Sequence, residues 1–309
     1  MSTATVLKPK KFVPLEVVDA QSLDEAADNL LKKGWTRLSC TTLPQRFERV
    51  ISAFVPMTDD PNRPDYAIDA KREFADGKSE LGLLETTKGT LKSNPRPDEI
   101  AEGRVREDET KYKFQFNNRL PGYYSRKGLI ERHVSFFSEV AQLHSEALLL
   151  GLEMAEKLDE RMPNYGFLER MFAGEHGAMT RLLRYMCDGE SPGIAQRHRD
   201  RDFLTIHVRS DRKGLWLADK NDVIVPDAQE TRTNSVLMFF GRKAWEMTEG
   251  KIKGIVHGVT DTTFGDSLRF PRHTIVTFLH AAVREDEQKW GNAHVHELTI
   301  PPHVDRYGL

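Results

Sequence analysis

The chain of 309 residues is poor in cysteine and contains no long apolar run. Its two cysteines, Cys40 and Cys187, form neither a CxxC pair nor a disulfide framework. This scarcity excludes a small disulfide-stabilised secreted scaffold, and a cytoplasmic location is expected. The N-terminus lacks the apolar core of a signal peptide, and no apolar run approaches membrane-spanning length, so we expect no membrane association.

An excess of charge of either sign is also missing. The 45 lysines and arginines nearly balance the 47 aspartates and glutamates, which gives a formal net charge of −2. We therefore expect no nucleic-acid partner bound through bulk positive charge. Hydrophobic residues make up 39% of the chain and charged residues 30%, as in an ordinary globular protein, and we expect a monomer.

The first part of the chain carries helix signals. Ser22-Leu23-Asp24-Glu25 has the capping-box pattern, and Gly34 is a typical residue to follow the end of the helix that it starts. Short strands are expected on either side, at residues 12–18 and from Trp35 to Cys40. Apolar residues at helical spacing predict the longest helix from Leu129 to about Met162.

Residues 59–106 are polar and interrupted by several prolines. We expect this stretch to be irregular, with short helices, and to form a mobile cover over a site.

The second part of the chain has a different texture, with many short apolar segments separated by turn residues. Such segments predict an antiparallel sandwich or jelly roll. We therefore divide the chain into a helix-rich mixed α/β region at 1–179, a jelly-roll core at 180–285 and a tail at 286–309. The expected strands are 181–185, 202–208, 214–218, 223–225, 235–240 and 273–279.

A metal-binding pattern stands within this core. His198 and Asp200 are two positions apart, and on a β-strand residues i and i+2 point to the same face. A second imidazole from another strand, His257, would complete a set of two histidines and one carboxylate. Such a set leaves octahedral positions open, which suits Fe(II) that must bind a co-substrate and O2. A mononuclear zinc hydrolase site would also fit these donors.

The order of the motifs is more informative than any one of them. As a set it resembles the isopenicillin N synthase-like family of Fe(II)/2-oxoglutarate-dependent dioxygenases, strongly over 181–280 and weakly in the N-terminal half. The family pattern reads HxD, a leucine-threonine strand, GLxV, a hydrophobic strand ending in glycine, TxGxxK, HxV and RxS. The matching segments are Arg181–Tyr185, His198–Asp200, Phe203–Ile206, Gly214–Leu217, Val236–Gly241, Thr248–Lys253, His257–Val259 and Arg272–Thr274.

The resemblance implies a double-stranded β-helix, or jelly roll, with Fe(II) held by His198, Asp200 and His257. It further implies that Arg272 and Thr274 bind the distal carboxylate of 2-oxoglutarate. A guanidinium and a hydroxyl on one strand face are suited to that task.

Other positions are less settled. The family usually has serine where Thr274 stands, which keeps the hydroxyl. Arg269 is a competitor for Arg272 but lacks a following hydroxyl. Tyr185 matches a family tyrosine whose hydroxyl reaches the co-substrate or substrate, although Met186 follows it in place of the usual proline, and a structural role is equally open.

The function that the resemblance implies is oxidation of a small organic substrate, by hydroxylation, desaturation or cyclisation, coupled to decarboxylation of 2-oxoglutarate. We expect this reaction to belong to specialised metabolism. Asp200 argues against a halogenase, because related halogenases replace this carboxylate with a small residue. Two further alternatives remain: an Fe(II) oxidase that uses O2 without 2-oxoglutarate, and a non-catalytic jelly-roll binding protein with a vestigial metal site. The sequence does not name the substrate.

Overall fold

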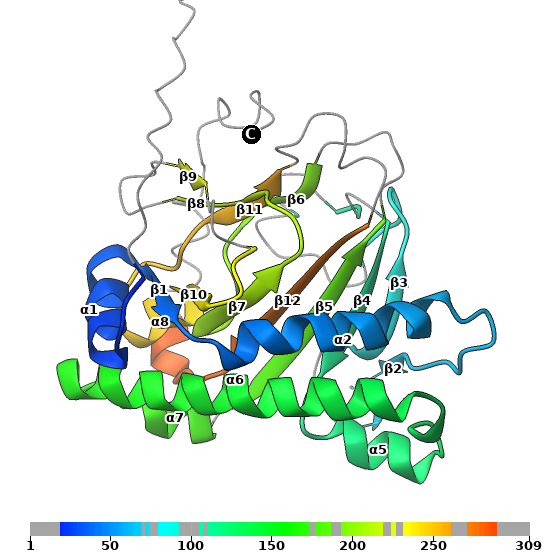
Figure 1. Ribbon diagram of the computed structural model, residues 1–309. Coiled ribbons are helices and arrows are strands. Elements are labelled where there is room, and N and C mark those ends of the chain that lie inside the picture. Colours follow the sequence, from blue (N-terminus) through cyan, green and yellow to red (C-terminus); the bar gives the residue numbers. More distant parts are fainter. Residues whose placement is uncertain are drawn as a thin grey trace, which may run out of the picture.

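Two antiparallel sheets form the frame of the protein in the computed structural model (Figure 1). The structure describes residues 19–69, 72–73, 80–92, 100, 105–107, 110–173, 177–186, 193–218, 224–226, 231–260 and 271–288. The large sheet has 8 strands in the order β1-β10-β7-β12-β5-β4-β3-β2, and the small sheet has 4 in the order β6-β11-β8-β9.

The strands of the large sheet are β1 (Trp35–Ser39), β2 (Ile68–Asp69), β3 (Glu80–Thr86), β4 (Lys111–Phe116), β5 (Ala178–Tyr185), β7 (Leu204–Ser210), β10 (Ser235–Phe240) and β12 (Arg272–Leu279). Those of the small sheet are β6 (Gly193–His198), β8 (Leu215–Ala218), β9 (Ile224–Pro226) and β11 (His257–Thr260). The helices are α1 (Leu23–Lys33), α2 (Thr42–Asp59), α5 (Leu120–Arg126), α6 (Val134–Arg161), α7 (Phe167–Ala173) and α8 (Arg242–Met247).

The first helix forms as its end signals predict. The Ser22 hydroxyl accepts a hydrogen bond from the amide of Glu25 at 3.2 Å, and Gly34 ends the helix in the left-handed conformation with φ of 85°. The Glu25 carboxylate accepts a hydrogen bond of 2.9 Å from the amide of Gln21, one residue before the capping serine. The chain then enters β1 directly at Trp35.

Helices cover one face of the large sheet. Figure 1 shows α2 and α6 running side by side across it, and both contact β7. The alternating residues Leu204, Ile206 and Val208 of β7 belong to the buried apolar core on this side. The longest helix starts at Val134, after a short 3₁₀ turn at Glu131–His133, slightly later than the sequence predicts.

The small sheet lies against the opposite face. A second buried cluster joins the two sheets, with Leu237 and Phe239 from β10, Leu215 and Leu217 from β8, and Val259 from β11. Helices, large sheet and small sheet therefore form successive layers, and the expected jelly roll with flanking helices is confirmed.

The predictions for the N-terminal half need one correction. Residues 80–86, expected to be irregular, form β3, which pairs with β4 and extends the large sheet. The alternation of buried Leu81 and Leu83 shows why a strand is stable here. The large sheet thus takes strands from both sides of residue 180, and the proposed domain division stays a prediction. The expected strand at 12–18 and the tail beyond 288 lie outside the described residues.

Among the helices of the described ranges, none is long and apolar enough to cross a bilayer.

Candidate metal centre and co-substrate site

Two histidines meet where the strands of the small sheet pair. His198 is the last residue of β6 and His257 the first of β11, and the two are direct partners in the antiparallel register. Cross-strand partners carry their side chains on the same face of a sheet. The ring centroids accordingly lie 4.3 Å apart, and the ring of Phe239 packs 4.7 Å from that of His257.

Asp200 reaches the same point by a different route from the one expected. We predicted that His198 and Asp200 share one strand face, but β6 ends at His198 and Asp200 follows in the connection to β7. The backbone holds it there, because the carbonyl of Asp200 accepts a hydrogen bond of 2.8 Å from the amide of Arg242.

The glycine before Arg242 explains how the two segments come so close. A Cβ atom on Gly241 would lie 2.1 Å from the carbonyl oxygen of Asp202, so only glycine fits without movement of the backbone. The amide of Gly241 also donates to the carbonyl of Phe203 at 2.9 Å. The strand-ending glycine of the motif therefore has a structural task, which is to fix the loop that carries Asp200.

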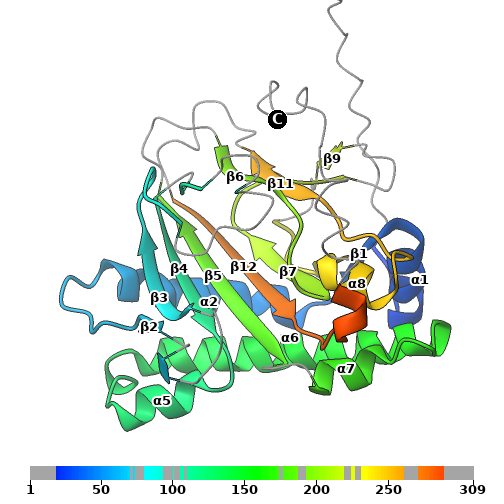
Figure 2. The same cartoon turned by 180° about the vertical axis from the view of Figure 1, so that it is seen from behind.

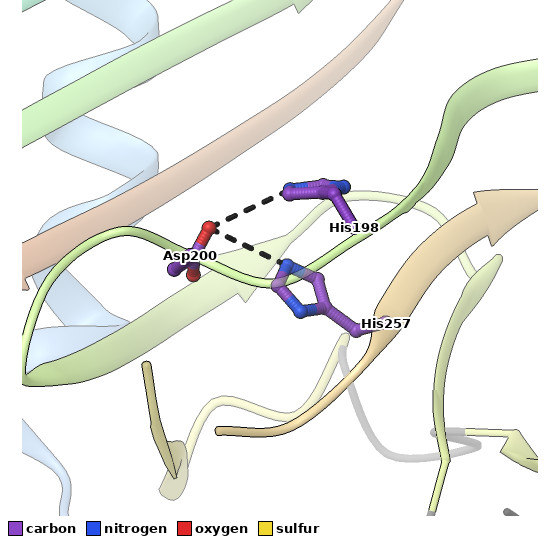
Figure 3. Close-up of side chains that lie close together, drawn as sticks. All are labelled: His198, Asp200 and His257. Carbon is purple, nitrogen blue, oxygen red and sulfur yellow. Dashed lines mark ion pairs between the residues drawn. The ribbon is translucent and has the colours of Figure 1, made fainter. Parts of the chain in front are cut away.

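The three side chains form a compact donor set (Figure 3). One ligand atom from each lies within 4.8 Å of the others. Asp200 Oδ1 is 3.5 Å from His198 Nε2 and 3.7 Å from His257 Nε2. This is the only such group of histidine, cysteine or acidic side chains among the described residues.

Neighbouring groups orient these donors as a metal would require. His257 Nδ1 lies 3.3 Å from the carbonyl oxygen of Ile255, which can only accept, so the proton belongs on Nδ1 and Nε2 keeps its lone pair. The hydroxyl of Thr205 donates to Asp200 Oδ2 at 2.6 Å, which leaves Oδ1 facing the imidazoles. Two nitrogens and one oxygen on one side, with nothing else required of the protein, fit an octahedral Fe(II) site.

The Asp200 side chain is a carboxylate at neutral pH. Burial alone would raise its pKa, but interactions with His257, His198 and the hydroxyl of Thr205 outweigh burial and hold the pKa well below its usual range. The group therefore needs no deprotonation before it can bind a cation.

The second predicted pair lies on β12, in the large sheet. Arg272 is 2% exposed, and its Nη2 donates to the hydroxyl of Ser210 on β7 at 2.8 Å. Ser210 in turn donates to the hydroxyl of Thr274 at 2.7 Å. Thr274 lies 3.1 Å from Nε2 of His207, so guanidinium, two hydroxyls and imidazole form one buried chain.

His207 and Ser210 are functional candidates that the sequence analysis did not identify. Burial, followed by the charge of Arg272, holds the pKa of His207 well below its usual value, so the ring is neutral and its Nε2 can accept a hydrogen bond from the hydroxyl of Thr274. The sequence carried only a weak signal for this site, which is that Thr205 and His207 stand at alternate positions among the apolar residues of β7. A β-bulge opposite Ile275 and Val276 brings Ser210 to the same face, and the sequence does not show it.

Tyr185 is the cross-strand partner of Arg272, on β5. Its ring centroid lies 5.7 Å from the guanidinium carbon of Arg272, which places it beside the predicted co-substrate pair. Arg184 lies on the other face of β5 and pairs with Asp59 at 2.5 Å, so its role is structural. Arg269 lies outside the described residues.

Comparison with solved structures shows which class of fold this is. No family model matches the sequence, and no curated protein sequence matches it either. Solved structures do match over nearly the whole chain, and they share with it the fold of the 2-oxoglutarate–Fe(II) oxygenases.

A candidate oxygenase from Shewanella oneidensis is 17% identical, with a TM-score of 0.64, and covers 94% of this chain and 100% of its own. A Neurospora crassa protein in complex with alpha-KG is 17% identical, with a TM-score of 0.60, covering 90% of both chains. The dioxygenase for auxin oxidation 1 of Arabidopsis thaliana, solved with 2-oxoglutarate, is 16% identical, with a TM-score of 0.56, and covers 88% of this chain and 92% of its own.

Proposed function

We propose that this protein is a non-haem Fe(II)- and 2-oxoglutarate-dependent oxygenase that oxidises a small organic substrate. The observation that carries the proposal is the pairing of two sites in one fold. The donor set of His198, Asp200 and His257 lies on the small sheet and the loop that follows β6. The buried pair Arg272 and Thr274 lies on the large sheet, against which the small sheet packs.

The side chains divide the work. His198, Asp200 and His257 would hold Fe(II), and Arg272 with Thr274 would bind the distal carboxylate of 2-oxoglutarate through charge-assisted hydrogen bonds. When bound, iron and the keto acid together supply oxidation of a C–H bond by O2, with release of CO2 and succinate. Phe239, packed on His257, keeps water from that side of the metal site.

The solved structures that resemble this chain support the proposed class of reaction. They include a 2-oxoglutarate–Fe(II) oxygenase family member, a complex with alpha-KG, and a complex with alpha-KG and thymine. We extend the proposal to hydroxylation, desaturation or cyclisation in specialised metabolism, by a cytoplasmic monomer.

Succinate formation tests the proposal. Purified protein supplied with Fe(II), 2-oxoglutarate and O2 is expected to form succinate, slowly without substrate and faster with it. Protein supplied with Zn(II) in place of iron should form none, because zinc has no redox chemistry. If no succinate forms under any condition while O2 is consumed with a substrate, the oxidase alternative replaces this proposal. If neither 2-oxoglutarate nor O2 is consumed, the site is not that of an oxygenase.

A further inference from the structure

A cation on β5 faces the proposed reaction site without taking part in the donor set or the co-substrate pair. In the register between β12 and β5, Arg272 pairs with Tyr185 and Val276 pairs with Arg181. Because side chains alternate along a strand, Arg181 lies on the same sheet face as Tyr185 and Arg272. Val276 also pairs with His207 on β7, so Arg181 lies one strand from Arg272 and Thr274 and two strands from His207. Figure 2 shows β5 next to β12 in the large sheet.

The contacts of Arg181 leave its charge uncompensated. Its Nε and Nη2 both donate to the side-chain oxygen of Gln115 on β4, at 3.0 and 2.7 Å. Its guanidinium carbon lies 4.7 Å from the ring centroid of Phe278. These partners are neutral, and no carboxylate of the described residues forms an ion pair with Arg181.

Arginines on the opposite face behave differently. Arg184, on the same strand, pairs with Asp59, and Arg209, on β7, pairs with Glu48 at 2.6 Å. Of these three arginines, only Arg181 faces the proposed site, and its guanidinium donates to an amide oxygen in place of a carboxylate. An amide acceptor orients a guanidinium and leaves its charge available to an incoming anion.

A second cation increases the demand for an anion. Lys113 lies on the same face of β4 as Gln115, and its Nζ forms an ion pair of 3.5 Å with the partly exposed carboxylate of Glu80, so two cations share this one carboxylate. Burial, and next the charge of Arg181, lower the pKa of Lys113 to about 8. Two cations in a partly buried region are stabilised when an anion binds between them.

The metal site strengthens this asymmetry. The carboxylates whose charges act most on Arg181 are those of Asp200 and Asp202. Asp202 already pairs with His280, and a divalent cation on Asp200 would cancel its negative charge. With the metal site filled, the charge of Asp200 therefore no longer offsets that of Arg181.

We propose that Arg181, oriented by Gln115 and assisted by Lys113, binds a carboxylate of the substrate, so that the oxidised compound is an organic acid. This inference rests on the proposed function and names its substrate class. Arg181 is a specificity residue here, distinct from Arg272, which serves the co-substrate.

The test uses paired probes that differ only in charge. Dissociation constants of phenylacetate and phenylacetamide, and of hexanoate and hexanamide, are measured by ligand-observed NMR with protein holding Zn(II) and 2-oxoglutarate. We expect the wild type to bind each acid about tenfold to a hundredfold more tightly than its amide, the range for a hydrogen bond to a charged group. Arg181→Gln should abolish this preference, and Arg184→Gln, on the same strand but the other face, should retain it.

A second variant guards against a misfolded first one. Gln115→Glu leaves Arg181 in place but offers it a permanent carboxylate, so the acid preference should disappear in a protein that folds normally. Lack of an acid preference in the wild type, or its persistence in Gln115→Glu and Arg181→Gln, would overturn the inference. So would a loss of 2-oxoglutarate affinity in Arg181→Gln as large as in Arg272→Ala, since Arg181 would then serve the co-substrate. These outcomes are separate from succinate formation, which tests the proposed function without any of the probes.

Discussion

The backbone carbonyl of Asp200 accepts a hydrogen bond of 2.8 Å from the amide of Arg242, the first residue of α8. The position of the proposed carboxylate ligand is thus fixed by the residues that follow β10, about 40 positions further along the chain. The preceding strand, β6, already ends at His198. The close approach depends on Gly241, where an added Cβ would lie 2.1 Å from the carbonyl oxygen of Asp202.

Gly241→Ala should therefore damage the metal site from outside it. Because backbone must move to admit the methyl group, we expect a loss of about 1–3 kcal/mol in the free energy of unfolding, as for other overpacked sites. We also expect weaker Fe(II) binding. Denaturant titration and Fe(II) titration measure the two effects. Gly122→Ala is the matched control, since its nearest non-neighbouring atom is 3.5 Å from the added Cβ and neither quantity should fall.

Asp200→Ala should abolish iron-dependent turnover and leave the fold largely intact. The side chain lies between two imidazoles and contributes little to the apolar core, so its loss removes a ligand more than a packing contact. Succinate formation and circular dichroism check the two halves of this prediction. Asp28→Ala, which removes an exposed carboxylate paired with Arg161, should keep full activity.

Arg272→Ala should raise the 2-oxoglutarate concentration needed for half-maximal succinate formation much more than it changes Fe(II) affinity. Loss of a charge-assisted contact in a desolvated site costs about 2–4 kcal/mol, or roughly tens- to several-hundredfold in affinity. Arg272→Lys should recover only part of this, because an ammonium keeps the charge but lacks the planar fork. If Arg269→Ala shows the large shift in place of Arg272→Ala, the assignment on this strand is wrong.

Ser210→Ala tests the buried chain that the sequence did not reveal. Its hydroxyl accepts from Arg272 and donates to Thr274, so its removal should loosen both groups. The loss of such a hydrogen bond is worth about 0.5–1.5 kcal/mol, and 2-oxoglutarate affinity should fall by roughly two- to tenfold with Fe(II) affinity unchanged. An unchanged affinity for 2-oxoglutarate would show that Arg272 and Thr274 do not need Ser210.

His144 gives the apoprotein a pH-dependent stability. His144 is buried on α6, and its Nδ1 is hydrogen-bonded to the hydroxyl of Thr180 at 2.9 Å. Burial, followed by the charge of His280, lowers the pKa of His144 to about 4. In an unfolded chain its pKa is about 6.5, so between these values the unfolded state binds more protons and stability falls as the pH falls. The shift is worth about 2–4 kcal/mol by pH 4. Urea titrations of metal-free wild type and His144→Gln should show this slope in the first and a flatter one in the second.

The sequence predicted most of the second half of the molecule, because short strands and turns follow one another there. Strands such as Ser235–Phe240 and Arg272–Leu279 are short apolar runs between turn residues, so their bounds follow from local pattern. The histidines and the carboxylate were identified as a set, and the structure brings them together, although its metal remains a proposal.

The parts that were missed depend on distant pairing. The spacing predicted Asp200 on the strand face of His198, whereas the hydrogen bond that holds its backbone comes from the amide of Arg242, far along the chain. The strand at residues 80–86 exists through its pairing with β4, and polar neighbours with several prolines hid it. Arg181 looked like any strand arginine until the register set it beside Gln115 and opposite Val276.

One spectroscopic measurement tests the central claim most directly. Fe(II) and then 2-oxoglutarate are added to the protein without O2, and the visible absorption spectrum is recorded for the wild type and for Asp200→Ala. Chelation of the keto acid to iron held by His198, Asp200 and His257 predicts a visible charge-transfer band in the wild type that is absent from the variant. A wild type without the band, or a variant that keeps it, would contradict the assignment of this donor set.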